Sequence, residues 1–589
     1  MYVARAPLLL LAASTVVANP VSRAAALSVS VIQANSSTRW FEGSSEVQIF
    51  DVAVKNTGNT WLTTQDKLTV YVDSPGLITA RPASVKRLRP NDTAIVEVGV
   101  VNKPGVADGS SGPATVVAEW ESQGKSSLDI AATYGIPTYD PTQSSVDQHE
   151  APDWWRKAKF GIFIHWGLFS IPAWGNVGAN ESYAEWYWSH QMNPEDPTQT
   201  YQWGLEHYGP LFIYDDFIAN FTADRFNPKD WVDLFADAGA QYFVQVTKHH
   251  DGFALFNMSD SISERNSVAQ NPHRDFLREI FDAAKQYQPH LHRGTYYSLP
   301  EWFNPLYTPY TMDGEFGVGP PKNPYTNETV PYTGLVEVGD YVADFQLPSM
   351  NILANDYDTD IMWCDIGGAN MAPQFAAPWI NAARQQNRQV TINNRCGGID
   401  GDFQTPEYAS STLLTTTPWE ATRGMDPFSF GFNAATPDST YMTASDVVTS
   451  LVDIVAKNGN FLLDIGPRGD GSIADVMSSH LREAGKWFKA HSESIFDTKY
   501  WPSGPGTGVF RYTTTEEAFY IHVMSQPQGV LVVPDLVPYL AGDRVTVVGG
   551  SKSGAVVPSR QLANGSLVLD VSADIGNADQ YTWTFKITY

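Results

Sequence analysis

Short apolar runs alternate with amphipathic helical patterns from residue 153 to residue 494, and this alternation limits the possible folds most. Each apolar run is followed by a polar or glycine-rich loop, which is typical of buried parallel strands joined by crossover helices. The strand candidates are 160–166, 242–247, 292–298, 360–364, 389–394, 412–417 and 461–465, and the helix candidates include 228–238, 273–286, 445–457 and 473–489. Seven to eight such units predict an α/β domain, a (β/α)8-like TIM barrel.

The segments on either side of this region read as β structure. Residues 27–135 contain alternating runs at 47–54, 67–72 and 94–100, separated by turn residues, which predicts an immunoglobulin- or fibronectin-like β-sandwich. Residues 495–589 return to strand patterns at 508–512, 518–523, 529–533, 544–548 and 583–587, which predicts a second sandwich. Residues 136–152 are rich in proline, serine and threonine and are predicted to be a linker. The expected fold is therefore multidomain, with the barrel at 153–494 between two β-sandwiches.

The N-terminal 26 residues have the pattern of a secretory signal peptide. Arg5 supplies a positive charge, residues 7–17 are apolar but too few to cross a bilayer, and small residues place the cleavage site near 18 or 26. Seven N-glycosylation sequons agree with export, and they begin at Asn35, Asn91, Asn180, Asn220, Asn257, Asn327 and Asn564. We therefore expect a secreted, extracellular glycoprotein.

The net charge of −26 argues against two classes of partner. Such a field repels nucleic acid and anionic membrane surfaces, and no other stretch approaches the roughly 18 apolar residues of a membrane span. No nucleic-acid or membrane partner is therefore expected.

Polar side chains follow several of the predicted barrel strands. In a TIM barrel these positions meet at the C-terminal end of the strands, where active sites lie. They are His165, His249, His250, Tyr296, Tyr297, Asp365, Arg395, Trp419 and Glu420. A glycosidase needs one acid to protonate the leaving oxygen and a second carboxylate as nucleophile or base, and Asp365 is the leading candidate for one of the two.

Seven motifs in this region occur in the order found in a known family. They are FGIFIHWG (160–167), EWY (185–187), KHHDGF (248–253), YYS (296–298), MWCD (362–365), GDFQTPEY (401–408) and NGNFLL (458–463). Over residues 150–490 the chain resembles the α-L-fucosidases of glycoside hydrolase family 29. The resemblance implies a barrel followed by a C-terminal β-sandwich, a retaining mechanism without metal or other cofactor, and a fucosylated oligosaccharide or glycoconjugate as substrate. The N-terminal sandwich is not part of that pattern.

The resemblance also implies the roles of individual residues. Asp365 matches the nucleophile, which forms a glycosyl-enzyme ester. Glu407 matches the general acid/base best, with Glu420 as the second candidate, and Arg395 is expected to orient a carboxylate or to hold the Glu407 loop. The expected substrate-binding residues are His165, Trp166, Glu185, Trp186, His249, His250, Tyr297, Trp363 and Arg395.

The three histidines also raise the question of a metal site. Neighbouring His249 and His250 are predicted to point to opposite sides of an extended strand, which disfavours a shared metal ion. Hydrogen bonding to sugar hydroxyls is the expected role, and no metal is predicted.

Cys364 and Cys396 are the only cysteines. Each adjoins a predicted inward residue, Asp365 or Arg395, so strand alternation sends both thiols outward. A disulfide and two buried free thiols both remain open.

Three functions remain under consideration. The first is the fucosidase, the second is a catalytically inactive fucose-binding protein on the same fold, and the third is a related retaining α-L-galactosidase. An inactive derivative would be expected to lose Asp365 or Glu407, and this chain keeps both.

Overall fold

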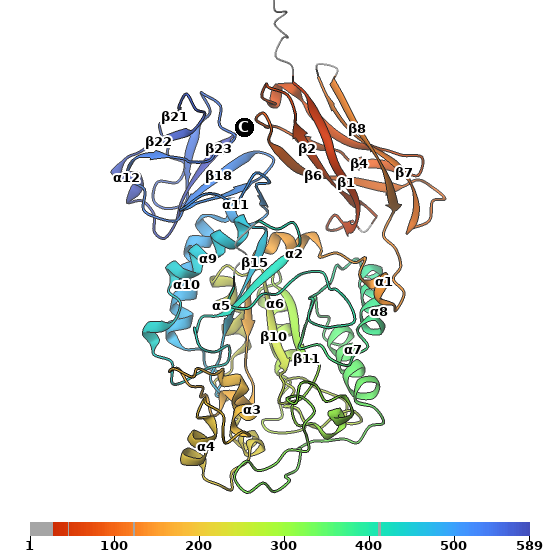
Figure 1. Cartoon of the computed structure of the whole chain (residues 1–589), viewed down its shortest axis with the longest axis vertical. Coiled ribbons are helices and arrows are strands. Elements are labelled where there is room, and N and C mark those ends of the chain that lie inside the picture. The colour runs from red at the N-terminus through yellow and green to blue at the C-terminus, as the bar shows by residue number, and fades with distance from the viewer. Residues whose placement is uncertain (1–26, 45, 122–123, 410–413) are drawn as a thin grey trace, which may run out of the picture.

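Three β-rich units follow one another along the chain (Figure 1). The computed structural model describes residues 27–44, 46–121, 124–409 and 414–589. The predicted signal peptide, residues 1–26, lies outside the described residues. The fold is the expected multidomain one, with a central TIM-type barrel and antiparallel β-sheets in the N-terminal and C-terminal regions.

The N-terminal unit consists of two four-stranded antiparallel sheets, in the orders β1-β2-β6-β4 and β5-β3-β7-β8. Their strands are β1 (Val29–Trp40), β2 (Gln48–Asn56), β3 (Leu68–Asp73), β4 (Leu77–Arg81), β5 (Ala83–Val85), β6 (Thr93–Asn102), β7 (Ser110–Trp120) and β8 (Gly124–Tyr134). In β3, Leu68, Val70 and Val72 are buried while the residues between them are not. This period of two lets each sheet bury one face in a shared apolar core.

The barrel is formed by parallel strands. Seven are paired in the order β13-β12-β11-β10-β9-β15-β14. They are β9 (Phe160–Ile164), β10 (Tyr242–Lys248), β11 (His292–Ser298), β12 (Ile361–Asp365), β13 (Thr391–Ile392), β14 (Trp419–Gly424) and β15 (Gly459–Ile465). Parallel bridges from Asn393 to Phe403, from Gln404 to Trp419 and from Glu407 to Thr422 close the gap between β13 and β14. Residues 403–407 therefore take the place of an eighth, irregular strand of the barrel.

The helices have sequence-encoded ends. Asn227 caps α5, whose first residue is Pro228, and Thr443 with Asp446 forms a capping box at the start of α9. The α-helices are α1 (Gln143–Val146), α2 (Asp153–Ala158), α3 (Tyr187–Gln191), α4 (Thr200–Tyr208), α5 (Pro228–Asp237), α6 (Phe276–Tyr287), α7 (Leu347–Asn355), α8 (Ala372–Gln385), α9 (Ala444–Ala456), α10 (Asp475–Ala490), α11 (Ser492–Ile495) and α12 (Ala573–Gly576). None of the helices in the described part of the chain is long and apolar enough to cross a membrane.

The C-terminal unit has one five-stranded sheet, β16-β17-β18-β23-β20, and one three-stranded sheet, β19-β22-β21. The strands are β16 (Lys499–Tyr500), β17 (Phe510–Thr514), β18 (Ala518–Val523), β19 (Gly529–Val532), β20 (Val545–Val548), β21 (Ser559–Gln561), β22 (Leu567–Val571) and β23 (Trp583–Thr588). Both β-sheet units lie at the same end of the barrel, beside α2, and α3 and α4 lie at the other end (Figure 1). Because α2 leads into β9, the sandwiches cover the N-terminal end of the barrel strands.

One predicted strand is misplaced. Residues 412–417 were expected to form a barrel strand, but 410–413 lie outside the described residues and 414–417 form no strand. The barrel strand is β14, which begins at Trp419. It contains Glu420 and Arg423, so it lacks the continuous apolar run by which a buried parallel strand is recognised.

The segment predicted as a linker packs against the barrel. The backbone N–H of Tyr139 donates to Asn381 Oδ1 on α8 at 2.9 Å, and Val146 on α1 is buried. His149 Nδ1 lies 2.9 Å from Asp402 Oδ1. These contacts fix the path of residues 136–152 along the barrel wall.

Candidate active site

Asp365 is the last residue of β12 and lies inside the barrel mouth. Ile361 and Trp363 pack with the interior residues of the barrel, whereas Met362 and Cys364 face the outer helices, so alternation turns Asp365 inward. Its Oδ2 accepts from the Tyr296 hydroxyl at 2.7 Å, and its Oδ1 accepts from Arg395 Nη1 at 3.1 Å. The backbone N–H of Ile366 donates to Oδ1 at 2.9 Å.

These donors decide the charge of Asp365. Burial alone would raise its pKa, but Arg395, His250 and the Tyr296 hydrogen bond together hold the pKa below its usual value. Tyr296 keeps its proton, because burial and the neighbouring carboxylate raise its pKa well above the ordinary value. Asp365 is therefore a carboxylate at neutral pH, which is the form that can act as a nucleophile.

Arg395 joins two carboxylates. Its Nη1 donates to Asp365 and to Oε1 of Glu407, while its Nε and Nη2 donate to the side chain and carbonyl of Thr405. The guanidinium lies over the Trp363 ring, 4.9 Å from its centroid. Because both carboxylate oxygens bond the same nitrogen, Arg395 Nη1, the two oxygens lie within roughly 6 Å of one another. The structure thus brings together Asp365, Glu407, Arg395 and Trp363.

Glu420, the second candidate for the acid/base, lies deeper in the barrel. Its Oε1 accepts from Trp363 Nε1 at 3.0 Å, its Oε2 accepts from the Tyr242 hydroxyl at 2.6 Å, and the side chain is fully buried. Burial raises the pKa of Glu420 to about 7. Both carboxylate oxygens of Glu420 are thus engaged, one by Trp363 and one by Tyr242.

The three histidines gather around Tyr296. The His165 and His249 rings lie 5.6 and 5.8 Å from the Tyr296 ring, and His250 Nε2 lies 3.9 Å from Asp365 Oδ2. Burial lowers the pKa of His165 to about 3 and that of His250 to about 4, and it lowers the pKa of His249 well below the usual value. The imidazoles are therefore neutral. Nδ1 of His165 bonds Asp464 and Nδ1 of His250 bonds Ser298, so each of these rings keeps Nε2 for a hydrogen bond with a hydroxyl group.

The prediction that His249 and His250 point to opposite sides is wrong. Strand β10 ends at Lys248 and the chain turns, so the two rings lie 3.9 Å apart. The pleat that underlies the prediction does not continue past Lys248. Among the described residues, no group of three or more His, Cys, Asp or Glu side chains is arranged to hold a metal ion.

Two of the predicted substrate-binding residues do not lie in this cluster. Tyr297 is fully buried on the outer side of β11, and its neighbour Tyr296 faces Asp365. Trp166 donates to the carbonyl of Arg468 at 2.8 Å and packs among Phe221, Phe226, Trp231 and Phe276 behind the barrel wall. Strand alternation applied from His165 would have turned Trp166 away from the site, and it allows only one of the adjacent Tyr296 and Tyr297 to face inward.

Glu185 and Trp186 lie on two sides of the site. The Trp186 ring lies 5.4 Å from the His250 ring. Glu185 is buried and accepts from the backbone N–H of Gly431 at 2.8 Å, and burial raises its pKa to about 7. It holds the loop that carries Phe430, whose ring lies 5.0 Å from that of His165. Glu185 therefore supports the wall of the site from behind.

Sequence reasoning missed Asp464 and Trp302. Asp464 at the end of β15 bonds His165 Nδ1 at 2.6 Å, and Trp302 packs 5.3 Å from the rings of both Trp186 and His250. Asp464 is the one acid inside the predicted apolar strand 461–465, and that position was an available signal. Trp302 lies in a loop, and no periodic pattern marks it.

A disulfide ties two strands of the site together. Cys364 and Cys396 are bonded, with Cα atoms 4.8 Å apart, which resolves the question that the sequence leaves open. Because Cys364 precedes Asp365 and Cys396 follows Arg395, the bond holds the Arg395 loop beside the β12 terminus.

Comparison with known proteins identifies the family. The α-L-fucosidase family model matches residues 128–493. This chain belongs to the α-L-fucosidase family.

Individual fucosidases align with most of the chain. It is 32% identical over 412 residues to an α-L-fucosidase of Dictyostelium discoideum, which covers 67% of this chain and 83% of that protein. It is 31% identical over 467 residues to the human tissue α-L-fucosidase, which covers 76% of this chain and 92% of that protein. The crystal structure of Thermotoga maritima α-fucosidase with a mechanism-based inhibitor superposes with a TM-score of 0.63 at 29% identity, over 77% of this chain and all of that one. The chain is thus an α-L-fucosidase by family, and the family match leaves residues 1–127 and 494–589 uncovered.

Proposed function

We propose that this fucosidase is a secreted retaining exo-enzyme that hydrolyses terminal α-L-fucosyl residues of glycans by double displacement. The observation that carries the proposal is the pair of carboxylates on Arg395 Nη1. Two carboxyl groups about 5–5.5 Å apart suit a retaining mechanism, whereas inverting enzymes need about 6.5–9.5 Å to admit a water molecule. The shared nitrogen keeps Asp365 and Glu407 close to the shorter spacing.

In the first step, an oxygen of Asp365 attacks C1 of the fucosyl ring as the bond from C1 to the glycosidic oxygen breaks. Glu407 gives its proton to that leaving oxygen, and the sugar remains as an ester on Asp365. In the second step, Glu407 takes a proton from water, the water oxygen attacks C1, and Asp365 is released as a carboxylate. Two inversions at C1 give net retention.

The neutral residues around the carboxylates suit the sugar. Fucose presents three free hydroxyls and a C6 methyl, and the cluster offers neutral imidazoles at His165, His249 and His250 together with the aromatic faces of Trp186 and Trp363. Imidazole nitrogens can bond the hydroxyls while aromatic faces cover the apolar side of the ring. A Thermotoga maritima relative has been crystallised with fucose itself, which supports the same ligand here.

Secretion rests on two features. The signal-like pattern of residues 1–26 directs export, and the buried Cys364–Cys396 disulfide suits an oxidising compartment, where such bonds persist.

The test uses an aryl α-L-fucoside and the matching aryl α-L-galactoside, which differ only at C6. We expect faster release from the fucoside, with the α anomer of free fucose appearing first by proton NMR. Initial appearance of the β anomer would contradict retention. Binding of fucose without turnover of either substrate would instead identify an inactive binding protein.

A further inference from the structure

A cavity of about 850 Å³ lies where the three units meet, at the end of the barrel opposite the candidate active site. Lys159, Pro418 and Asn458, which immediately precede strands β9, β14 and β15, form its floor. Asp365 ends strand β12 and Arg395 follows strand β13 at the other end. The N-terminal and C-terminal sandwiches form the remaining walls. The cavity is thus separate from the candidate active site, and its volume lies in the range of small-molecule sites, about 300–1,000 Å³.

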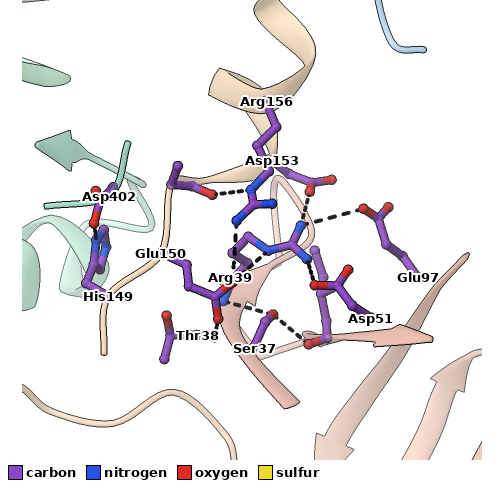
Figure 2. Close-up of polar contacts among 12 residues, drawn as sticks. Ser37, Thr38, Arg39, Asp51, Glu97, His149, Glu150, Asp153, Arg156 and Asp402 are labelled. Atoms are coloured by element: carbon purple, nitrogen blue, oxygen red, sulfur yellow. Dashed lines mark hydrogen bonds and ion pairs between the residues drawn. The ribbon is translucent and has the colours of Figure 1, made fainter. Parts of the chain in front are cut away.

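The carboxylates of one wall are already neutralised by a network around Arg39 (Figure 2). The Arg39 guanidinium lies 2.5 Å from Asp51 and 2.6 Å from Asp153, and it also lies 3.5 Å from both Glu97 and Glu150. Additional cations complete the pairing, with Lys157 at 2.9 Å from Asp153 and Lys499 at 3.2 Å from Glu97. This wall therefore offers no free negative charge that would attract a cation.

Lys159 lines the same cavity and differs from these cations. It is 96% buried, since only 4% of its surface is exposed, and its ammonium forms no ion pair or hydrogen bond with any residue in the described part of the chain. Burial and the nearby charge of Arg156 lower the pKa of Lys159 to about 8, and the carboxylates of Asp497 and Asp153, which line the same cavity, only partly oppose this shift. The backbone of Lys159 has a φ of 60°, which residues other than glycine rarely adopt.

Arg156 adds a second weakly compensated cation. Its side chain donates to the carbonyl of Ala151 at 2.9 Å, and its only ion pair among the described residues is with Glu150 at 3.5 Å. Burial and the charge of Arg39 lower the pKa of Arg156. Arg156 is 28% exposed and ion-paired, whereas Lys159 is a buried charge without a close partner. Such a charge is costly, so an anion that reached Lys159 would gain electrostatic stabilisation.

The rest of the lining suits a polar ring. Phe41 and Tyr500 are half-buried aromatic residues on opposite sandwiches, and Gln33 and Thr417 add hydrogen-bonding groups. Aromatic faces and amide or hydroxyl groups together bind rings that carry hydroxyls.

We propose that this inter-unit cavity is a binding site for an acidic monosaccharide, with its carboxylate, sulfate or phosphate group paired to Lys159. The site is independent of the hydrolytic centre. It is assembled only when the N-terminal sandwich is in place, since Arg39 and Phe41 come from that unit.

Isothermal titration of the full chain tests the proposal, with L-fucose at saturation to occupy the active site. The probes are glucuronate, glucose 6-sulfate, glucose 6-phosphate, uncharged glucose and inorganic sulfate. We expect saturable binding of at least one acidic sugar, with glucose and inorganic sulfate at least roughly tenfold weaker. Lys159→Met should weaken that binding at least about tenfold, whereas Lys486→Met, an exposed position on α10, should leave it unchanged.

Two results would overturn the proposal: no saturable binding of any acidic sugar, or equal affinity in the Lys159→Met variant. Inorganic sulfate binding as tightly as the sugars would also overturn it, because the ring would then not be recognised. A measurement on the unmodified chain guards against misfolding of the variant. Acetylation by acetic anhydride, followed by peptide mass spectrometry, should show ligand protection at Lys159 and none at Lys486. Equal acetylation of Lys159 with and without the acidic sugar contradicts the proposal.

Discussion

Arg395 Nη1 hydrogen-bonds two carboxylates at once, Asp365 Oδ1 at 3.1 Å and Glu407 Oε1. One cation therefore holds the proposed nucleophile and the proposed acid/base in a fixed relation. The disulfide between the neighbouring Cys364 and Cys396 keeps that cation in place.

Replacing Arg395 should move the acid limb of the pH–rate profile. The charge of Arg395 lowers the pKa of Asp365, so its removal in Arg395→Met raises that pKa. Ionised Asp365 is then lost at a higher pH, and the acid limb of kcat/KM shifts upward. The control is Arg482→Met on the exposed face of α10, which should leave the profile unchanged. An unshifted limb in Arg395→Met would show that Arg395 does not set the charge of the nucleophile.

The two candidate acids should behave differently when truncated. Glu407→Ala should slow substrates with poor leaving groups far more than activated aryl fucosides, because only the former need a proton. Glu420→Ala should instead lower stability by about 1–3 kcal/mol, since it leaves the buried donors of Trp363 and Tyr242 without an acceptor. Leaving-group dependence and thermal unfolding of both variants separate the roles. A leaving-group effect confined to Glu420→Ala would reverse the assignment.

The adjacent tyrosines of β11 provide a matched pair. Tyr296→Phe removes the hydroxyl that donates to Asp365 at 2.7 Å, and a hydrogen bond to a charged group is worth about 1.5–3 kcal/mol. We expect kcat/KM to fall roughly 10- to 100-fold, with the acid limb moving to higher pH. Tyr297→Phe removes a hydroxyl on the outer face of β11 and should leave kcat/KM and the position of the acid limb unchanged. Similar losses in the two variants would contradict the orientation of the strand.

The N-terminal sandwich should affect stability more than catalysis of small substrates. Arg39→Met leaves buried carboxylates without their cation and should cost about 3–5 kcal/mol of unfolding free energy, with kcat on an aryl fucoside retained. Lys67→Met, which breaks an exposed ion pair with Glu121 in the same sandwich, should cost less than about 1 kcal/mol. A folded chain beginning near Ser145 should likewise keep activity on the aryl fucoside. Loss of that activity, with circular dichroism unchanged, would show that the sandwich contributes to the catalytic site.

Predictions from the sequence are correct where the backbone is regular and fail where it is not. Asp365 was found because β12 is a regular apolar strand with an acid at its end. The directions predicted for the His249 and His250 side chains are wrong because the chain turns after Lys248, and a turn has no fixed side-chain period. Trp419 and Glu420 were not recognised as part of a strand, because polar side chains inside β14 interrupt the apolar run. The Arg39 network joins residues about 110 positions apart in the chain, and no local pattern indicates such a contact.

The central claim is that Asp365 attacks the sugar, and trapping the covalent intermediate tests it most directly. A 2-deoxy-2-fluoro-α-L-fucosyl fluoride forms the ester but slows its hydrolysis, because fluorine destabilises the positively charged transition state. Peptide mass spectrometry should then find the fluorofucosyl mass on Asp365, and Asp365→Asn should show neither label nor more than a trace of turnover. Labelling of Glu407 or another residue, or near-normal turnover by Asp365→Asn, would contradict the account.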